Sequence, residues 1–181
     1  MSPDERTEAL RQLWTEGDYA SIGERFAPAA QRSSTMRLAG RRVLDAGTGT
    51  GNAALAAARA GAQVSAFDLT PALLAQARQR AKDAGVRVEF READLLAIPW
   101  PDASFDDVLS VFAAFLADDP ARALAELVRV CRPGGRVATT AWSERSIFFR
   151  MMQVVNAHDA DVAPLRDPSP FADRGQLTAL A

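Results

Sequence analysis

One ten-residue stretch decides the fold of this chain: Val43-Leu44-Asp45-Ala46-Gly47-Thr48-Gly49-Thr50-Gly51-Asn52. Its first residues are typical of a short strand, glycines follow at alternate positions, and Asn52 opens an alanine-rich segment typical of a helix. A strand that runs through glycines into a helix lets the backbone approach a ligand closely, with free amides at the helix start. The stretch therefore predicts a ligand-binding turn between a strand and a helix.

A carboxylate follows at the distance that such a turn can use. The predicted second strand, residues 64–68, ends in Asp68, which lies 17 residues beyond Gly51. In a doubly wound sheet a carboxylate at this strand end lies beside the glycine turn and can accept hydrogen bonds from both ribose hydroxyls. The turn and Asp68 together predict a site for an adenosine-containing ligand, whereas the glycines alone would only indicate a tight turn.

The spacing of the glycines favours one kind of ligand over another. A dinucleotide-binding turn usually reads G-x-G-x-x-G, but the third glycine of that pattern is replaced here by Asn52. The observed G-x-G-x-G suits a ligand without a pyrophosphate. An NAD(P)-binding oxidoreductase keeps the same fold and is the weaker alternative, because the chain also lacks a Tyr-x-x-x-Lys pair.

Strands and helices alternate along most of the chain. Strands are predicted at 43–45, 64–68, 86–90, 108–112 and 137–141, with helical segments between them. This alternation predicts an α/β, doubly wound, Rossmann-like fold with a mainly parallel sheet and helices on both faces. Residues 1–40 are predicted to form a helical cap, and residues 41–181 the ligand-binding domain.

Composition excludes several classes of partner. The chain has 181 residues, 48% of them hydrophobic, which suits one domain, and its formal net charge is −2. Without a basic cluster, neither nucleic acid nor an anionic membrane is an expected partner. A single cysteine, no apolar run of about 18 residues and a charged start without a signal peptide predict a cytoplasmic protein.

Other chemistry-bearing side chains offer no second site. They are three aspartates, one histidine and two tryptophans: Asp102, Asp106, Asp107, His158, Trp100 and Trp142. The aspartates are expected in a solvated loop rather than a metal site, because no histidine or cysteine cluster accompanies them. The histidine is expected to be exposed, and the tryptophans to pack rather than to stack on a substrate. No metal and no catalytic residue is predicted.

Four blocks of sequence between residue 43 and about residue 142 resemble one enzyme family. The blocks are 45–51, 67–71, 92–95 with 99–106, and 126–135, and a Gly-Asp-Tyr at 17–19 precedes them. They are similar to the class I S-adenosylmethionine-dependent methyltransferases of the ubiquinone/menaquinone biosynthesis type (methyltransferase type 11). The resemblance implies that 41–181 is an S-adenosylmethionine-binding domain.

The resemblance also implies a set of cofactor-binding residues: Tyr19, Asp45, Ala46, Gly47, Thr48, Gly49, Asn52, Asp68, Leu69, Asp94, Leu95 and Ser110. Residues 46–49 would line the methionine part, with Asp45 supporting its ammonium group. Ser110 would offer its backbone carbonyl near that group, and Tyr19 would close the pocket over the carboxylate.

The adenosine end is implied to lie on the next two strands. Asp68 would hold the ribose and Leu69 would pack beside the adenine. Asp94 would accept a hydrogen bond from the adenine amino group, with Leu95 against the ring. Each has a structural alternative: Asp94 as the cap of its loop, the leucines as core residues, Ser110 as a small packing residue and Thr48 as a support of the turn.

The implied activity is methyl transfer from S-adenosylmethionine to a small-molecule acceptor, which requires no metal. The family completes a seven-stranded sheet, whereas five strands are predicted here, so the C-terminal strands are expected to be missing. The alternative is a truncated protein that binds the cofactor but is catalytically inactive. A sheet edge left open in this way would favour a homodimer, because exposed edges are usually paired or covered.

Overall fold

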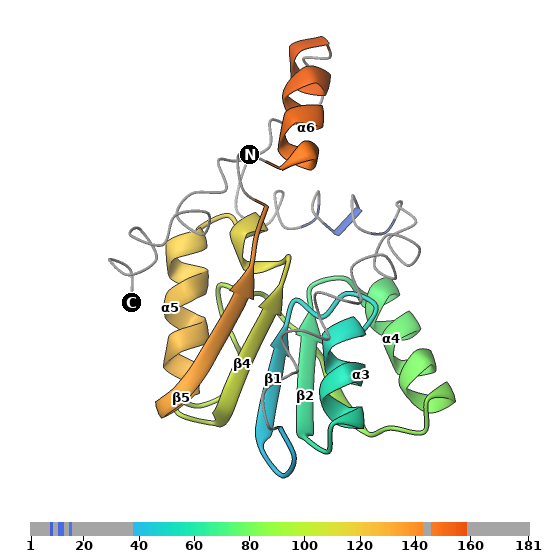
Figure 1. Ribbon diagram of the computed structural model, residues 1–181, viewed down its shortest axis with the longest axis vertical. Helices are drawn as coiled ribbons and strands as arrows, with labels where there is room; N and C mark the ends of the chain where they lie inside the picture. Colours follow the sequence, from blue (N-terminus) through green and yellow to red (C-terminus); the bar gives the residue numbers. More distant parts are fainter. Residues whose placement is uncertain (1–7, 9–10, 13–14, 16–37, 143–145, 159–181) are drawn as a thin grey trace.

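The structure, a computed structural model, describes residues 8, 11–12, 15, 38–142 and 146–158 (Figure 1). Its strands form one all-parallel sheet in the order β3-β2-β1-β4-β5. The strands are β1 (Arg42–Ala46), β2 (Gln63–Asp68), β3 (Val88–Glu92), β4 (Phe105–Val111) and β5 (Cys131–Thr140). The helices are α3 (Asn52–Arg59), α4 (Pro71–Asp83), α5 (Pro120–Val130), α6 (Ile147–His158) and the short 3₁₀ helix η1 (Ala114–Leu116). The predicted doubly wound fold is confirmed.

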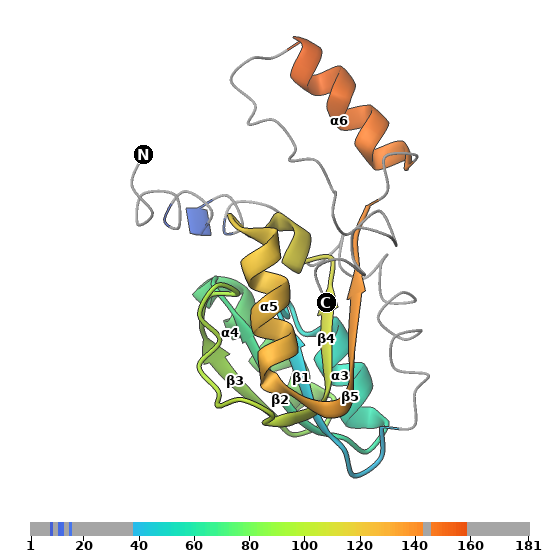
Figure 2. The same cartoon turned by 90° about the vertical axis from the view of Figure 1, so that its left-hand side faces the viewer.

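Two apolar cores hold helices against opposite faces of the sheet. Neighbouring residues of β1 point to different faces, so Val43 packs with α3 while Leu44 packs with α5. Figure 2 shows α3 and α5 on either side of the sheet. Burial on both faces explains why the central strands are almost continuously apolar.

The helix starts follow from local sequence. Asp119 caps α5 by accepting a hydrogen bond from the Arg122 amide at 2.9 Å, and Pro120 occupies the first turn. On the same helix the Val128 side chain is 41% exposed, whereas Val130 is fully buried.

The expectation that Asp106 and Asp107 lie in a solvated loop is wrong. Both belong to β4, and Asp107 is fully buried, where it accepts hydrogen bonds from Arg41 and, at 2.5 Å, from Arg136. Burial raises the pKa of Asp107, but the two arginines outweigh it and lower the pKa overall. Arg132 similarly holds Asp106 at 2.7 Å. These aspartates stabilise the amino-terminal end of the sheet.

Helix α6 lies beyond the carboxyl ends of β4 and β5, away from the sheet in both views (Figures 1 and 2). Met151 and Val154 on this helix are 52% and 61% exposed, and His158 at its end is exposed as expected. Among the described ranges, no helix combines the length and apolar character needed to span a bilayer. Of the helical cap predicted for residues 1–40, the structure describes residues 8, 11–12, 15 and 38–40. The other residues of the predicted cap lie outside the described part.

Candidate functional site

Three loops meet at the carboxyl ends of β1, β2 and β3. The glycine turn after β1 is tied to β2 because the amides of Gly47 and Thr48 both donate to the Phe67 carbonyl, at 3.0 and 2.9 Å. The loop after β3 is tied to β2 through the Ala93 amide, which donates to the Asp68 carbonyl at 3.1 Å. The strand order reverses between β1 and β4, and ligands of open α/β sheets bind at such a switch point.

The Asp68 carboxylate lies between two of these loops. Its Oδ2 accepts the Gly49 amide at 2.7 Å and its Oδ1 accepts the Thr70 amide at 2.9 Å. Burial raises the pKa of Asp68, and these backbone hydrogen bonds oppose the rise. A carboxylate has about four acceptor positions, so both oxygens can accept further hydrogen bonds. The half-buried carboxylate is therefore suited to a ligand with paired hydroxyls.

The Asp45 carboxylate is buried beneath the turn and organises it. Its Oδ2 accepts the Thr48 hydroxyl at 2.7 Å and the Ala54 amide at 2.8 Å, which joins the turn to α3. Its Oδ1 accepts no hydrogen bond from the described residues. Burial raises the pKa of Asp45 to about 6, and the bonds from Thr48 and Ala54 limit the rise. A nearby cation, such as an ammonium group, would favour its charged form.

The glycines of the turn have different roles. A Cβ at Gly47 would lie 2.4 Å from the Cβ of Ala113, so this glycine lets the chain after β4 pack on the turn. A Cβ at Gly49 would meet nothing within 4 Å, although the backbone there has a positive φ of 54°. The open side of the turn is therefore at Gly49, next to the Asp68 carboxylate, where a ligand can approach the backbone closely.

An arginine that the sequence did not single out clamps the end of the turn. The Arg80 side chain, from α4, donates to the Thr50 carbonyl at 2.7 Å and to its hydroxyl at 2.9 Å. Its other terminal nitrogen donates to the Asn52 side chain at 2.9 Å. Asn52, predicted to bind the cofactor, is thus also engaged in holding the turn.

The loop after β3 carries Asp94 and Leu95. Asp94 accepts the Leu96 amide at 2.9 Å, which is the loop-capping role given as its alternative. Leu95 lies 3.8 Å from the Cβ position of residue 47 and so borders the glycine turn. Near the same edge, Arg11 donates to the Leu69 carbonyl at 3.2 Å and to Glu92 at 2.8 Å.

Two residues of α5 anchor the continuation of this loop, and neither was predicted. Glu126 accepts the Ile98 amide at 2.9 Å. Arg129 donates to the carbonyls of Ile98 and Trp100, both at 2.9 Å, and pairs with Glu126 and Asp102. The Arg129 hydrogen bond lowers the pKa of Glu126. This clasp joins the segments 99–106 and 126–135 in space. Asp102 lies exposed in a loop, as expected, and forms an ion pair with Arg129 there.

Ser110 joins β4 to the end of β1. Its hydroxyl donates to the Ala46 carbonyl at 3.0 Å and accepts the Ala114 amide at 3.1 Å, and the residue is fully buried. The side chain therefore has a structural role. β4 ends one residue later, at Val111.

The predicted site residues divide into two layers. Half-buried residues that can face a ligand are Gly47, Gly49, Asn52, Asp68, Leu69, Asp94 and Leu95. Buried residues that support them are Asp45, Ala46, Thr48 and Ser110. Tyr19 lies outside the described residues. The structure brings the other eleven to one edge of the sheet, and their roles toward a cofactor stay predictions.

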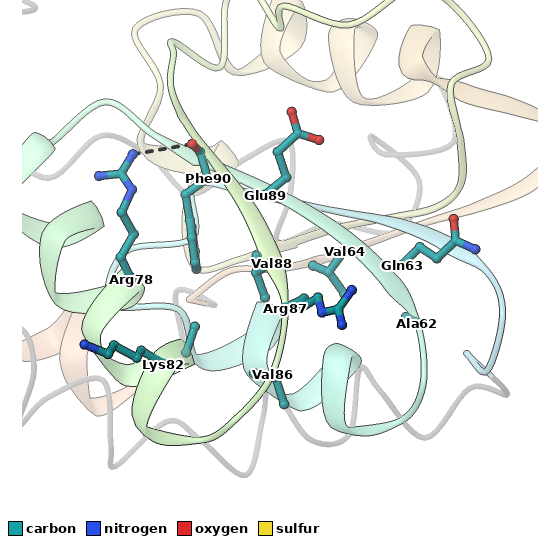
Figure 3. A pocket seen from close by; sticks show the side chains of 11 residues that line it. Ala62, Gln63, Val64, Arg78, Lys82, Val86, Arg87, Val88, Glu89 and Phe90 are labelled. Carbon is teal, nitrogen blue, oxygen red and sulfur yellow. Dashed lines mark hydrogen bonds between the residues drawn. The ribbon is translucent and has the colours of Figure 1, made fainter.

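A hollow of about 710 Å³ lies elsewhere, beside α4 and the first residues of β2 and β3 (Figure 3). Val64, Val88 and Phe90 line it, with Arg78 and Lys82 from α4. In Figure 3 the charged side chains of Arg78, Lys82 and Glu89 point in different directions rather than toward one point. The hollow lacks the convergent polar groups of a specific ligand site.

A glycine turn with an open side, a carboxylate with spare acceptor positions and a switch-point location are the features that a Rossmann-like nucleotide-binding fold uses for its ligand. The model of the methyltransferase domain family matches residues 44–139, and the chain belongs to this family, the class I S-adenosylmethionine-dependent methyltransferases.

Comparison with known proteins places the chain among longer relatives. It is 40% identical over 152 residues to an uncharacterized protein of Mycobacterium tuberculosis, covering 82% of this chain and 55% of the relative. It is 46% identical over 104 residues to the demethylmenaquinone methyltransferase of Thermus thermophilus, covering 56% and 47%. A crystal structure of an S-adenosylmethionine-dependent methyltransferase from Mesorhizobium loti matches with a TM-score of 0.56 at 30% identity, covering 64% and 53%. The chain thus spans about half the length of these relatives.

Proposed function

We propose that this chain binds S-adenosylmethionine at the carboxyl ends of β1, β2 and β3 and transfers its methyl group to a small-molecule acceptor. The observation that carries the proposal is the Asp68 carboxylate, held by the Gly49 and Thr70 amides beside the open side of the turn. Paired ribose hydroxyls would complete its hydrogen bonds, and the absence of a Cβ at Gly49 leaves room for the ligand.

The remaining roles follow from charge and position. Asp45 would meet the ammonium group through its Oδ1, while Oδ2 keeps the turn in place. Asp94 and Leu95 would border the adenine. When bound, S-adenosylmethionine supplies a methyl group activated by a positively charged sulfur. The protein then needs mainly to align the acceptor and exclude water, and no residue is assigned as a general base.

Titration calorimetry with S-adenosylhomocysteine, and with NAD as the comparison ligand, tests the cofactor. Micromolar binding of S-adenosylhomocysteine alone would support the proposal. Tighter binding of NAD by a folded sample would replace it with the oxidoreductase alternative, for which Asn52 is an unfavourable feature.

A second candidate is a protein that binds the cofactor without turnover. The observations that favour it are the exposed Met151 and Val154 on α6, and β5, which pairs only with β4 in the part of the chain that is described. Pairing of two copies through this sheet edge stays a prediction. Incubation with methyl-labelled S-adenosylmethionine and a panel of small hydroxy and amino compounds separates the candidates. Label transfer to any compound supports the enzyme, whereas cofactor binding without transfer supports the second candidate.

A further inference from the structure

The segment that joins β2 to α4 contains a buried hydroxyl group without a hydrogen-bond partner. Thr70 is 1% exposed, and among the described residues its hydroxyl is the only buried side-chain group that makes no hydrogen bond. A buried hydroxyl without a partner destabilises a fold, because it gives up its hydrogen bonds to water and gains none in return. Such a group in a folded protein therefore requires a physical explanation.

A loose backbone does not explain it. The backbone carbonyls of residues 68, 69 and 70 all accept hydrogen bonds, at 3.1 to 3.2 Å. The Thr70 amide donates to the Oδ1 of Asp68 at 2.9 Å. The backbone on both sides of the hydroxyl is thus held in place.

Helix capping does not explain the hydroxyl either. Thr70 is the N-cap residue of α4, the position where a threonine usually accepts a hydrogen bond from a backbone amide of the first turn. The Thr70 side chain makes no such bond, although Pro71 begins the helix in the usual way. The hydroxyl can therefore donate to another group.

The group that it faces is the Asp68 carboxylate. Burial raises the pKa of Asp68, and the Thr70 hydroxyl is among the neighbouring groups that oppose the rise. The hydroxyl thus lies near enough to act on the charge of the carboxylate, although the two do not form a hydrogen bond of regular geometry. Asp68 is also the residue on which the proposed cofactor site depends, because its two oxygens already accept the Gly49 and Thr70 amides beside the open side of the turn.

We propose that Thr70 is a positioning residue of this site, and that its hydroxyl donates to the Asp68 carboxylate when the carboxylate accepts the ribose hydroxyls. The inference rests on the proposed methyltransferase function and adds a residue to its binding site. Paired hydroxyls fix the orientation of a carboxylate, and a further donor beside it favours its charged form. Hydrogen bonds of an active site are often poorly aligned in the free protein and tighten when the ligand binds. The hydroxyl then gains in the complex the partner that it lacks in the fold.

Two substitutions separate the hydroxyl from the rest of the side chain. Thr70→Val keeps the shape and removes the hydroxyl, whereas Thr70→Ser, the matched control, keeps the hydroxyl and removes a methyl group. Titration calorimetry of the full chain should show that Thr70→Val binds S-adenosylhomocysteine about tenfold more weakly than the wild-type protein. Its urea midpoint should not fall. Thr70→Ser should keep the wild-type affinity while its urea midpoint falls, because the lost methyl group leaves a small cavity.

A hydroxyl that only supports the fold would give a different pattern. Thr70→Val would then be less stable than the wild-type protein, or the two variants would bind the ligand equally well, and either result would overturn the inference. A double-mutant cycle shows whether the hydroxyl acts through Asp68. In the Asp68→Ala background Thr70→Val should cause no further loss of affinity, and an undiminished loss would contradict the proposed role.

The wild-type chain is titrated first, because this separates the two proposals. Absence of S-adenosylhomocysteine binding by the folded wild-type protein would overturn the proposed function and this inference with it. Wild-type binding that Thr70→Val leaves unchanged would overturn the role of Thr70 alone.

Discussion

The Gly49 amide and the Asp68 carboxylate are joined by a 2.7 Å hydrogen bond between residues that are 19 positions apart. The bond fixes the open side of the glycine turn at the end of β2, so the place where a ligand can touch the backbone is also where a carboxylate is available. Asp68 is half-buried, and burial raises its pKa while backbone amides oppose the rise. Each oxygen of this carboxylate can accept a further hydrogen bond, and binding of a ribose through its paired hydroxyls requires such acceptors.

Removal of that carboxylate should abolish most of the cofactor affinity. Asp68→Ala is expected to weaken S-adenosylhomocysteine binding by roughly 2 to 4 kcal/mol, because hydrogen bonds to a charged acceptor contribute about 1.5 to 3 kcal/mol each. Calorimetry measures the loss, and Glu89→Ala, an exposed carboxylate on β3, is the control. Unchanged affinity in Asp68→Ala would remove this residue from the site.

Arg80 should matter for the turn although it is not expected to touch the ligand. Arg80→Ala removes three hydrogen bonds to Thr50 and Asn52 and should lower the free energy of unfolding by about 1 to 2 kcal/mol. Cofactor affinity should fall with it. Arg78→Ala on the same helix removes only a 3.4 Å contact to the Phe90 carbonyl and should change neither quantity. Urea denaturation and calorimetry compare the two variants, and similar behaviour would argue against a clamp.

The clasp on α5 gives a third prediction. Arg129→Ala leaves the Ile98 and Trp100 carbonyls without their donor and should lower the free energy of unfolding by about 2 to 4 kcal/mol. Arg122→Ala, an exposed arginine on the same helix, should lower it by less than about 0.5 kcal/mol. Denaturation curves measure both. If the two variants are equally stable, the clasp contributes nothing to folding.

Asp45 should produce a pH dependence of stability with an unusual sign. Its pKa is raised to about 6 in the folded protein, from a model-compound value of 3.8. Between these values the folded state binds the proton more tightly than the unfolded state, so the stability contributed by this group falls as pH rises. The full change is about 3 kcal/mol and is complete above pH 6.

Comparison with Asp45→Asn separates the contribution of Asp45 to stability from those of the other carboxylates. The asparagine amide cannot titrate, and its oxygen can still accept hydrogen bonds from Thr48 and Ala54. The wild-type protein should lose stability relative to Asp45→Asn between pH 4 and pH 6.5 in urea denaturation. A constant difference over this range would show that Asp45 does not titrate there.

The sequence predicted the sheet because the signals for it are local. The signals are short apolar runs, the glycines that follow residues 44–46, and capping residues before helices, and each depends only on residues nearby in sequence. Together they predict the five strands and the predicted site residues at the carboxyl edge of the sheet. The match of 44–139 to the methyltransferase domain family confirms the resemblance on which the cofactor assignment was based.

What the sequence missed depends on contacts between distant segments. Arg80 reaches Thr50 across 30 positions, and Arg129 reaches Ile98 across 31. Asp106 and Asp107 resembled part of an acidic loop, because their arginine partners lie up to 66 positions away. Phe112, just after β4, has a positive φ of 56°. No local sequence pattern distinguishes it from an apolar residue at a strand end with ordinary backbone angles.

The open side of the turn is the central claim, and an alanine at Gly49 tests it most directly. Gly49→Ala and Gly85→Ala are matched, since both positions have a positive φ and open space around an added Cβ, so each should lose about 1 to 2 kcal/mol of stability. Only Gly49 borders the proposed site. S-adenosylhomocysteine should bind Gly49→Ala at least about tenfold more weakly than Gly85→Ala. Equal affinities in the two folded variants would contradict the account and place the cofactor elsewhere.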